Sequence, residues 1–403
     1  MNTIQKCNAY KIKDSRGEKT LEVEMSTGEH TVWASVPSGK STGSREAVVL
    51  SVDKAIRNVN DVIAPQLVGL KVNITEIDNL LINLDGTEDK SNLGANAILG
   101  VSVAVLKLEA KIAKQPLWQY IQSLSSRGTQ LTKFPKLFVN VLNGGVHADF
   151  RLPFQEYMFV LGNGMNASGP INQLQTLFRQ LENKLKKEGL KFFMGDEGGF
   201  SIESKDIEEP FKILSDLHDK LAIDVAAGEF FENNKYSVSG QKYTFDELAV
   251  VHKNLIKKFP IVSIEDPFNE NDLEAFSLMM QKLKDLEVIF PDREVLIVGD
   301  DLTTTNTEMI KKVIDGKMIN TVLIKPNQIG TVSETLKAIE MTHQAGLKTI
   351  VSHRSGETMD SFIADLAVGV GAYGLKAGSM FQQERKEKYD RLIEIEMEVN
   401  LEN

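Results

Sequence analysis

Four short apolar runs in the second half of the chain each end at a charged residue, and this pattern restricts the possible folds more than any other feature. The charged residues are Asp224 in LAIDVAA, Glu265 in IVSIEDP, Asp300 in LIVGDD and Lys325 in LIKPN. Short apolar runs that break off into turn residues are typical of buried strands. In an α/β barrel the C-terminal ends of the strands meet on one face, so this fold would gather three acids around Lys325.

The sequence after about residue 133 alternates apolar runs with helical patterns, as expected for a (β/α) barrel. The eight strand candidates, the number that closes such a barrel, are LFVNVL, EYMFVL, KFFMGDEGG, LAIDVAA, PIVSIEDP, VLIVGDD, TVLIKPN and KTIVSHR. A short further segment, GLKAGS, would lie beside the first and last strands. No helical pattern separates the first two runs, so the barrel is predicted to open with a β-hairpin instead of a regular βα unit.

The first part of the chain has a different pattern, strands followed by helices. Residues 21–36 alternate apolar and polar positions around a turn at Thr27 and Gly28, and helical spacing follows over 53–84 and 95–114. The segment 123–135 has the polar, Pro/Gly-containing composition of a linker. Since 403 residues exceed what one core usually fills, we predict an α/β protein with an α+β domain over 1–128 and an eight-stranded barrel over 133–403.

The overall charge and the single cysteine exclude several classes of partner and site. The chain has 46 basic and 56 acidic side chains, and the net charge of -10 argues against nucleic acid or an anionic membrane as the main partner. Cys7 is the only cysteine, so neither an intrachain disulfide nor a thiolate zinc site is expected. The first residues lack the apolar core of a signal peptide, and no run is long enough to span a membrane. We therefore expect a soluble, cytoplasmic protein.

The three strand-end carboxylates are candidates for a metal site. Asp224, Glu265 and Asp300 offer hard oxygen ligands without Cys or His, a set that favours magnesium over zinc. The alternative is that each carboxylate caps the helix that follows it. Three acids gathered together would repel one another unless a cation were bound, and this favours the metal site.

Lys325 and two further acids suggest an acid/base pair. A lysine at the end of a buried strand is poorly solvated, so its pKa is predicted to fall toward that of a base, although a lysine reaching from a strand end to solvent is the simpler alternative. Glu197 in GDEGGF and Glu156 in LPFQEY also lie at strand termini. They could supply the acid half of such a pair or form ion pairs with Lys325 and Lys376.

The remaining motifs concern anion binding. His353, Arg354 and Ser355 in SHRSGET offer donors at one strand end that suit a phosphate or a carboxylate. His147 follows a Gly pair in a loop, where a structural and a functional role are both open. The segment SGKSTG has the end of a P-loop, but Ala34 occupies the place of the first glycine of that motif, so a nucleotide site is not expected.

Taken in order, these motifs resemble the enolase family over nearly the whole chain, from DSRG at Asp14 to KYDRL at Lys388. They are DSRG, PSGKSTG, LDGTEDKSNLGANAILGVS, LNGGVHAD, QEY, GDEGGF, DVAAGEF, SIEDPF, GDDLTTTN, LIKPNQIGT, SHRSGET, LKAGS and KYDRL. The resemblance implies an α+β capping domain followed by an atypical barrel. It also implies reversible, magnesium-dependent dehydration of 2-phosphoglycerate to phosphoenolpyruvate, with two Mg²⁺ ions per active site.

The resemblance also assigns roles to individual residues. Asp224, Glu265 and Asp300 would hold the first magnesium, and Ser41, on a mobile loop, would join the second with the substrate phosphate. Lys325 would be the base and Glu197 the acid, assisted by Glu156. Asp301 would orient Lys325. The residues expected to hold the substrate are His147, Gln155, His353, Arg354, Ser355 and Lys376.

Several positions depart from the family pattern. Lys40 stands where the family usually has alanine, the loop after Leu50 is shorter, and Glu18 and Lys19 replace an Asn-Pro pair. None of these changes removes a chemical group. Two alternative functions remain open: another acid dehydratase of the same superfamily, and a non-catalytic relative that acts as a binding protein.

A further departure concerns assembly. The resemblance implies a homodimer in which Glu22 pairs with an arginine of the partner's C-terminal helix, but Glu394 occupies the place of that arginine here. Two facing acids repel, so the dimer is expected to be weakened unless Arg391, one helical turn earlier, compensates.

Overall fold

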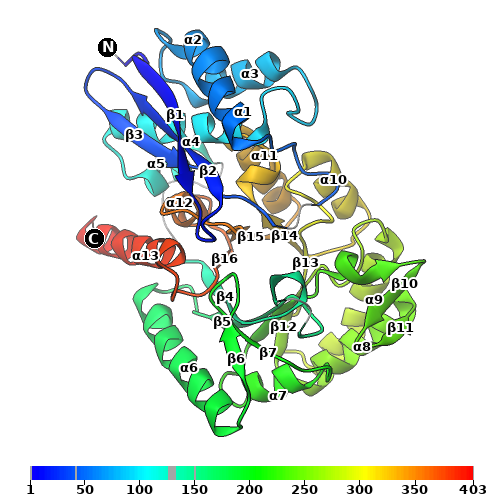
Figure 1. The fold of residues 1–403 in the computed structure, drawn as a ribbon. Coiled ribbons are helices and arrows are strands. Elements are labelled where there is room, and N and C mark those ends of the chain that lie inside the picture. Colours follow the sequence, from blue (N-terminus) through cyan, green and yellow to red (C-terminus); the bar gives the residue numbers. More distant parts are fainter. Residues whose placement is uncertain (1, 41–42, 126–132, 149–150, 403) are drawn as a thin grey trace.

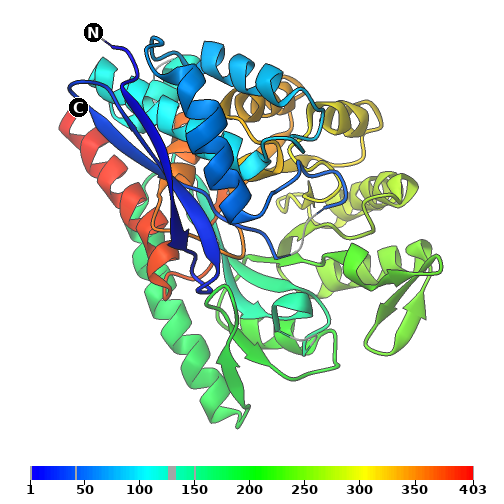
Figure 2. The same cartoon turned by 45° about the horizontal axis from the view of Figure 1, so that its top comes forward.

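Two sheets organise the chain in the computed structural model, which describes residues 2–40, 43–125, 133–148 and 151–402 (Figure 1). The side chains of Val146, His147, Glu287 and Glu402 lie outside this description. Among the described residues, the first sheet is antiparallel with three strands, and the second closes into a ring of eight strands. Figure 2 shows the first sheet and its helices gathered on one side of the ring.

The first sheet has the order β1-β2-β3 and packs against α4. The predicted hairpin is confirmed as β2–β3, with the Thr27 amide donating to the His30 carbonyl at 2.9 Å. The contact with α4 is close because Gly100 has no Cβ, and a Cβ there would lie 2.8 Å from Val23 Cγ2. The strands are Lys6–Lys13 (β1), Lys19–Ser26 (β2) and Thr31–Ser35 (β3).

Helices follow this sheet, as predicted for this part of the chain. The first runs on through a π-helical turn, Asn58–Ile63, into the second. The predicted helix over 95–114 is confirmed, and it begins after Gly94, whose φ of 94° favours glycine. The helices are Val52–Arg57 (α1), Ala64–Leu67 (α2), Ile74–Asp85 (α3), Ala95–Ala113 (α4) and Leu117–Leu124 (α5).

The ring is closed by the pairing of β16 with β4, and β5 runs antiparallel to both of its neighbours. The predicted opening hairpin is therefore confirmed as β4–β5. The ring strands are Lys136–Asn143 (β4), Glu156–Leu161 (β5), Leu221–Asp224 (β8), Ile261–Glu265 (β12), Leu296–Gly299 (β13), Thr321–Ile324 (β14), Lys348–Ser352 (β15) and Gly374–Lys376 (β16).

One strand assignment was wrong. The segment KFFMGDEGG is not a ring strand: its short strand Phe192–Met194 (β6) pairs with Phe200–Ile202 (β7), which is paired with β4 at Leu142 and Phe200. Phe193 and Met194 are exposed, so the apolar letters do not mark a buried strand. The eighth ring strand is β16 in GLKAGS, where Gly374 leaves room for the Phe138 ring.

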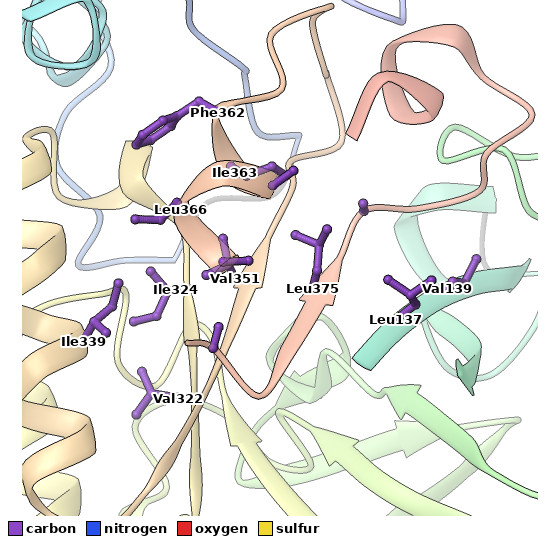
Figure 3. Packing of buried hydrophobic residues seen from close by; sticks show 14 of the residues in the cluster. Leu137, Val139, Val322, Ile324, Ile339, Val351, Phe362, Ile363, Leu366 and Leu375 are labelled. Atoms are coloured by element: carbon purple, nitrogen blue, oxygen red, sulfur yellow. The ribbon is translucent and has the colours of Figure 1, made fainter. Parts of the chain in front are cut away.

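Helices surround the ring and bury its outer face. Figure 3 shows Leu137 and Val139 of β4, Val322 and Ile324 of β14, and side chains of α11 and α12 in this layer. In α6 the leucines Leu174, Leu177, Leu181 and Leu185 are buried. The helices are Ser168–Lys187 (α6), Glu209–Ser215 (α7), Phe245–Lys258 (α8), Leu273–Ile289 (α9), Thr307–Asp315 (α10), Val332–Gln344 (α11), Phe362–Gly369 (α12) and Gln383–Glu402 (α13).

The interior of the ring is filled by the alternate side chains of the same strands. Phe138, Met158, Leu323 and Ile350 belong to this inner cluster. The short strands Phe231–Glu232 (β9), Lys235–Val238 (β10) and Gln241–Tyr243 (β11) form a separate small sheet. Across the described residues, no helix is both long and apolar enough to cross a membrane.

A buried histidine makes stability depend on pH. His252 lies between Phe154 and Phe268, its Nε2 bonds to the Pro267 carbonyl at 3.2 Å, and burial lowers its pKa to about 4. Above about pH 6.5 the residue is neutral in both states, whereas at lower pH only the unfolded chain takes up its proton. The protein should therefore lose about 3 kcal/mol of stability as the pH falls from about 6.5 to 4.

Urea unfolding at both pH values would test this expectation. His252→Gln keeps an N–H donor for Pro267 but cannot titrate, so its stability should fall less over the same interval. His30→Gln, at the β2–β3 turn, is the matched control and should behave as the wild type. An equal loss in wild type and His252→Gln would contradict the assignment.

Candidate active site

The predicted charged residues meet at one end of the ring. Asp224, Glu265 and Lys376 end β8, β12 and β16, while Asp300, Lys325 and His353 directly follow β13, β14 and β15. Glu156 begins the antiparallel strand β5 and is thereby brought to the same end. A pocket that opens to solvent lies there. Its lining includes Gln155, Glu156, Glu197, Asp224, Asp300, Asp301, Lys325, His353, Arg354, Ser355 and Lys376.

Three predicted site residues are not in this lining. Glu265 is buried beside it and contacts Lys376. Ser41 and the side chain of His147 lie outside the described residues, although the backbone of His147 forms part of a 3₁₀ turn, Gly145–Ala148.

Lys376 is surrounded by carboxylates. Its Nζ lies 2.9 Å from both carboxylate oxygens of Glu265, 3.1 Å from Asp224 Oδ2 and 3.2 Å from Glu156 Oε1. Burial alone would lower the pKa of Lys376, but Asp224, Glu156 and Glu265 together raise it well above the usual value. Lys376 is therefore a fixed positive charge in the pocket.

Lys325 forms an ion pair with Asp300 Oδ2. The prediction that the pKa of Lys325 falls was wrong: burial, the largest single influence, does lower it, but the carboxylates around Lys325, Asp300 before Glu265, together raise the pKa above its usual value. In turn, burial favours the neutral form of Asp300, but the Lys325 ammonium holds the pKa of that carboxyl below its usual value. Asp300 Oδ1 also accepts a hydrogen bond from Gln328 Nε2 at 2.9 Å.

Asp266 is a site residue that the sequence interpretation missed. Its two carboxylate oxygens accept the backbone amides of Asp300 and Asp301, at 3.0 and 2.8 Å, and so fix the turn after β13. Oxygens of all three acids lie within 4.8 Å of one another. Burial, followed by the charge of Asp300, raises the pKa of Asp301 to about 8. The available signal was the ED pair in SIEDP, from which only Glu265 was chosen.

Glu197 lies on the other flank of the pocket. Its Oε2 accepts a hydrogen bond from Asn140 Nδ2 at 3.0 Å and lies 3.7 Å from His353 Nε2. One ligand atom from each of Glu156, Glu197 and His353 lies within 4.8 Å of the other two. Burial, and then the charge of Glu197, raises the pKa of Glu156 well above its usual value. Glu156 and Glu197 are therefore disposed to retain a proton between them.

Arg354 has a partner that the sequence interpretation also missed. Its Nη1 and Nη2 lie 3.0 and 3.1 Å from the two oxygens of Glu46, and Nη1 donates to Asn327 Oδ1 at 2.7 Å. Glu46 belongs to the segment before α1, 308 residues from Arg354. Acidic residues are frequent in this chain, so Glu46 carried no signal in the sequence.

The oxygens of this pocket fit a hard divalent cation. Glu156 Oε2 and Gln155 Oε1 are buried, and each is without a hydrogen-bond partner in the described part of the protein. Burial, followed by the charge of Asp224, raises the pKa of Glu265 well above its usual value. The donors are oxygens of Asp and Glu, the set that suits magnesium more than zinc.

Comparison with known proteins gives consistent matches over almost the whole chain. The model of the enolase N-terminal domain matches residues 4–121, and the model of the enolase C-terminal TIM barrel domain matches residues 132–403. Proteins named enolase from two strains of Ureaplasma parvum serovar 3 are each 42% identical to this chain over 427 aligned residues. The alignments cover 97% of this chain and 95% of each relative.

Proposed function

Because this chain belongs to the enolase family and is a lyase that converts 2-phosphoglycerate reversibly into phosphoenolpyruvate, we propose that the pocket at the strand ends carries out that reaction with a paired base and acid. The observation that supports this proposal most is the placement of Lys325 and Glu197 on different flanks of one buried, charged pocket. The reaction needs one group to take a proton and another to assist the leaving hydroxide.

Lys325 removes the proton next to the substrate carboxylate, and Glu197 donates a proton to the departing hydroxide, assisted by Glu156. Magnesium, when bound, stabilises the negative charge that develops on the substrate carboxylate, as is generally described for the enolase superfamily. Before it can act as a base, Lys325 must give up its proton, which the ion pair with Asp300 opposes. Occupation of Asp300 by a cation would remove that opposition.

The remaining residues hold the ions and the substrate. We assign one Mg²⁺ to Asp224, Glu265 and Asp300, and a second to Ser41 with the substrate phosphate. Asp301 orients Lys325. The substrate is held by His147, Gln155, His353, Arg354, Ser355 and Lys376. Lys376 and Arg354 supply the positive charge that an anionic substrate needs in a protein of net charge -10.

Formation of phosphoenolpyruvate from 2-phosphoglycerate, followed by ultraviolet absorbance with and without magnesium, tests this function. Turnover that depends on magnesium is the expected result. Turnover of a phosphate-free hydroxy acid in preference to 2-phosphoglycerate would instead favour another acid dehydratase of the superfamily. Absence of turnover in the folded protein with magnesium would favour a non-catalytic binding protein.

The residues before Ser41 contact two parts of the barrel domain, one at Gly356 and one at Asp196. Ser38 and Gly356 exchange backbone hydrogen bonds of 2.8 Å, and Lys40 Nζ lies 2.8 Å from Oδ2 of Asp196, the neighbour of Glu197. The Lys40 and Asp196 side chains are 39% and 35% exposed, so their ion pair is worth about 1 kcal/mol or less. Lys40→Ala should therefore lower kcat/KM by about fivefold at most, and less when salt screens the pair.

Steady-state kinetics at low and moderate salt would measure this effect. Asp196→Asn should reproduce the loss, and the double variant should add little to it, whereas the exposed Lys54→Ala is a neutral control. Additive losses from the two single changes would contradict a role for the pair.

We also propose a homodimer that is weaker than is usual for the family. Arg391, the candidate replacement for the missing arginine, is engaged within its own chain: its guanidinium lies 2.9 Å from Asp365 Oδ1, 2.8 Å from Glu398 Oε1 and 3.0 Å from Glu394 Oε2. Glu22 accepts a hydrogen bond from Ser35 Oγ at 2.6 Å. Arg391 therefore has little capacity left to neutralise the repulsion between Glu22 of one protomer and Glu394 of its partner.

Sedimentation at low and moderate salt should show association that strengthens as salt screens the facing acids. Glu394→Arg should tighten the dimer at low salt, and Lys386→Gln on the same helix serves as a control. A tight wild-type dimer that loosens with salt would show that another ion pair holds the interface.

We further propose the division of the chain into a capping domain, 1–128, that carries the Ser41 loop, and a barrel domain, 133–403. The separate sheets of the two parts support this division. A cytoplasmic location is proposed from the glycolytic role and the single, buried cysteine.

A further inference from the structure

Arg385 is a fully buried arginine whose role is not explained by packing. It lies in the first turn of α13 and is 0% exposed. Within the described part of the chain, its side-chain hydrogen bonds are to neutral groups: Gln382 Oε1 at 2.7 Å, the carbonyls of Arg354 and Ser355 at 3.3 and 3.1 Å, and Nδ1 of His353. Burying a guanidinium without a carboxylate partner is costly, so its position calls for a function.

The contact with His353 fixes the state of that imidazole. A guanidinium has only N–H donors and no acceptor, so the His353 nitrogen that faces it must be the acceptor. Nδ1 therefore carries no proton, and a neutral His353 carries its proton on Nε2. The arrangement depends on Gly378, where a Cβ would lie 2.6 Å from Arg385 Cδ and 2.9 Å from His353 Cε1.

Most of the strongest electrostatic influences on His353 act in the same direction, although the acids Glu197 and Glu156 also lie beside it. Burial is the largest cause that lowers the pKa of His353, and the charges of Arg385, Lys376 and Lys325 lower it further. Glu197, 3.7 Å from Nε2, is the group that raises it. His353 and Glu197 could therefore share one proton in two ways: as imidazolium with carboxylate, or as neutral imidazole with carboxylic acid.

We propose that Arg385 is a positioning residue that keeps His353 neutral, with its proton on Nε2, and so leaves the proton of the His353–Glu197 pair on Glu197. This inference rests on the proposed role of Glu197 as the acid. A protonated His353 would present Nδ1–H to the N–H groups of Arg385, placing two donors and two like charges together. A charged His353 would also stabilise the Glu197 carboxylate and make Glu197 a poorer proton donor in dehydration.

The wild-type protein allows a direct test without any change to Arg385. The chain contains 6 histidines, so nitrogen NMR of protein labelled at histidine gives few signals, and His353→Gln identifies those of His353. A neutral Nε2–H tautomer that does not titrate between about pH 5 and 8 is expected. Titration in that range, or a proton on Nδ1, would overturn the inference.

Kinetics of two Arg385 variants test the consequence for catalysis. Arg385→Gln should lower kcat by about 10- to 100-fold and move the optimum for dehydration to lower pH, since Glu197 beside an imidazolium takes up its proton only there. Arg385→Lys keeps a cationic donor and should recover much of kcat. Arg391→Gln, on the same helix but outside the pocket, should keep the wild-type pH profile.

The outcomes separate this inference from the proposed function. A loss of activity in Arg385→Gln with an unchanged pH profile, in proportion to the folded fraction, would show a merely structural role. Where Arg385→Gln does not fold, the NMR result on the wild type still decides the tautomer. Full dehydration by Glu197→Gln would refute the proposed acid, whereas the tautomer of His353 would be unaffected by that result.

Discussion

Replacing Lys325 with alanine is expected to lower kcat by ~100- to 10,000-fold, the usual cost of losing a positioned general base. The side chain follows β14 and points into the pocket lining, where its polar contact is with Asp300. Removing it leaves a buried carboxylate that, among the residues the structure describes, keeps Gln328 as a side-chain donor, so some loss of stability will accompany the loss of activity. The barrel core itself is untouched, and the variant should stay folded at room temperature.

Absorbance assays together with urea unfolding measure the two effects separately. Lys348→Ala is the matched control, because Lys348 begins β15, at the opposite end of the ring from the pocket. It should retain activity. Normal turnover by Lys325→Ala would contradict the proposed role of Lys325. If Lys325→Ala does not fold, Lys325→Met, which keeps the length of the side chain, serves for the same measurement.

Removal of divalent cations is expected to abolish turnover, and magnesium should restore it, since oxygen ligands exchange the ion readily. The same treatment should lower the thermal stability. Magnesium at about 100 times its dissociation constant should stabilise the folded protein by about 3 kcal/mol relative to the chelated protein. The carboxylates of Asp224, Glu265 and Asp300 are the expected ligands.

Thermal unfolding with and without magnesium checks this expectation independently of activity. Asp224→Asn should lose the stabilisation by magnesium. Glu229→Gln, an exposed acid at the rim of the pocket, should keep it. Full activity after exhaustive chelation would mean that the carboxylate cluster is not a catalytic metal site.

The sequence predicted the location of the pocket because one local signal was repeated. Apolar runs that end in Asp224, Glu265, Asp300 and Lys325 define both the strands and their common end, and parallel pairing then brings them together. The pattern predicted the segment of β6 as the eighth ring strand, whereas β16 takes that place in the structure. This error shows the limit of the signal. Three residues are too few for periodicity to distinguish a ring strand from an edge hairpin.

The contacts that set the charge and the pKa values of the pocket residues could not be predicted, because they join residues that share no local sequence pattern. Glu46 meets Arg354 and Arg385 meets His353 across 308 and 32 residues. The pKa of Lys325 was predicted from burial alone, and the sign was wrong because Asp300 lies at ion-pair distance. Sequence pattern indicates which residues reach the pocket, but the balance of charge there depends on packing between distant elements.

The central claim is that Lys325 acts as the base and Glu197 as the acid. Proton exchange at carbon 2 of 2-phosphoglycerate tests this claim most directly. In deuterated buffer with magnesium, Glu197→Gln should keep exchanging this proton, because its base is intact, while dehydration falls by ~100- to 10,000-fold. Lys325→Ala should lose both exchange and dehydration. Exchange at the wild-type rate by Lys325→Ala, or its complete loss in Glu197→Gln, would contradict the account.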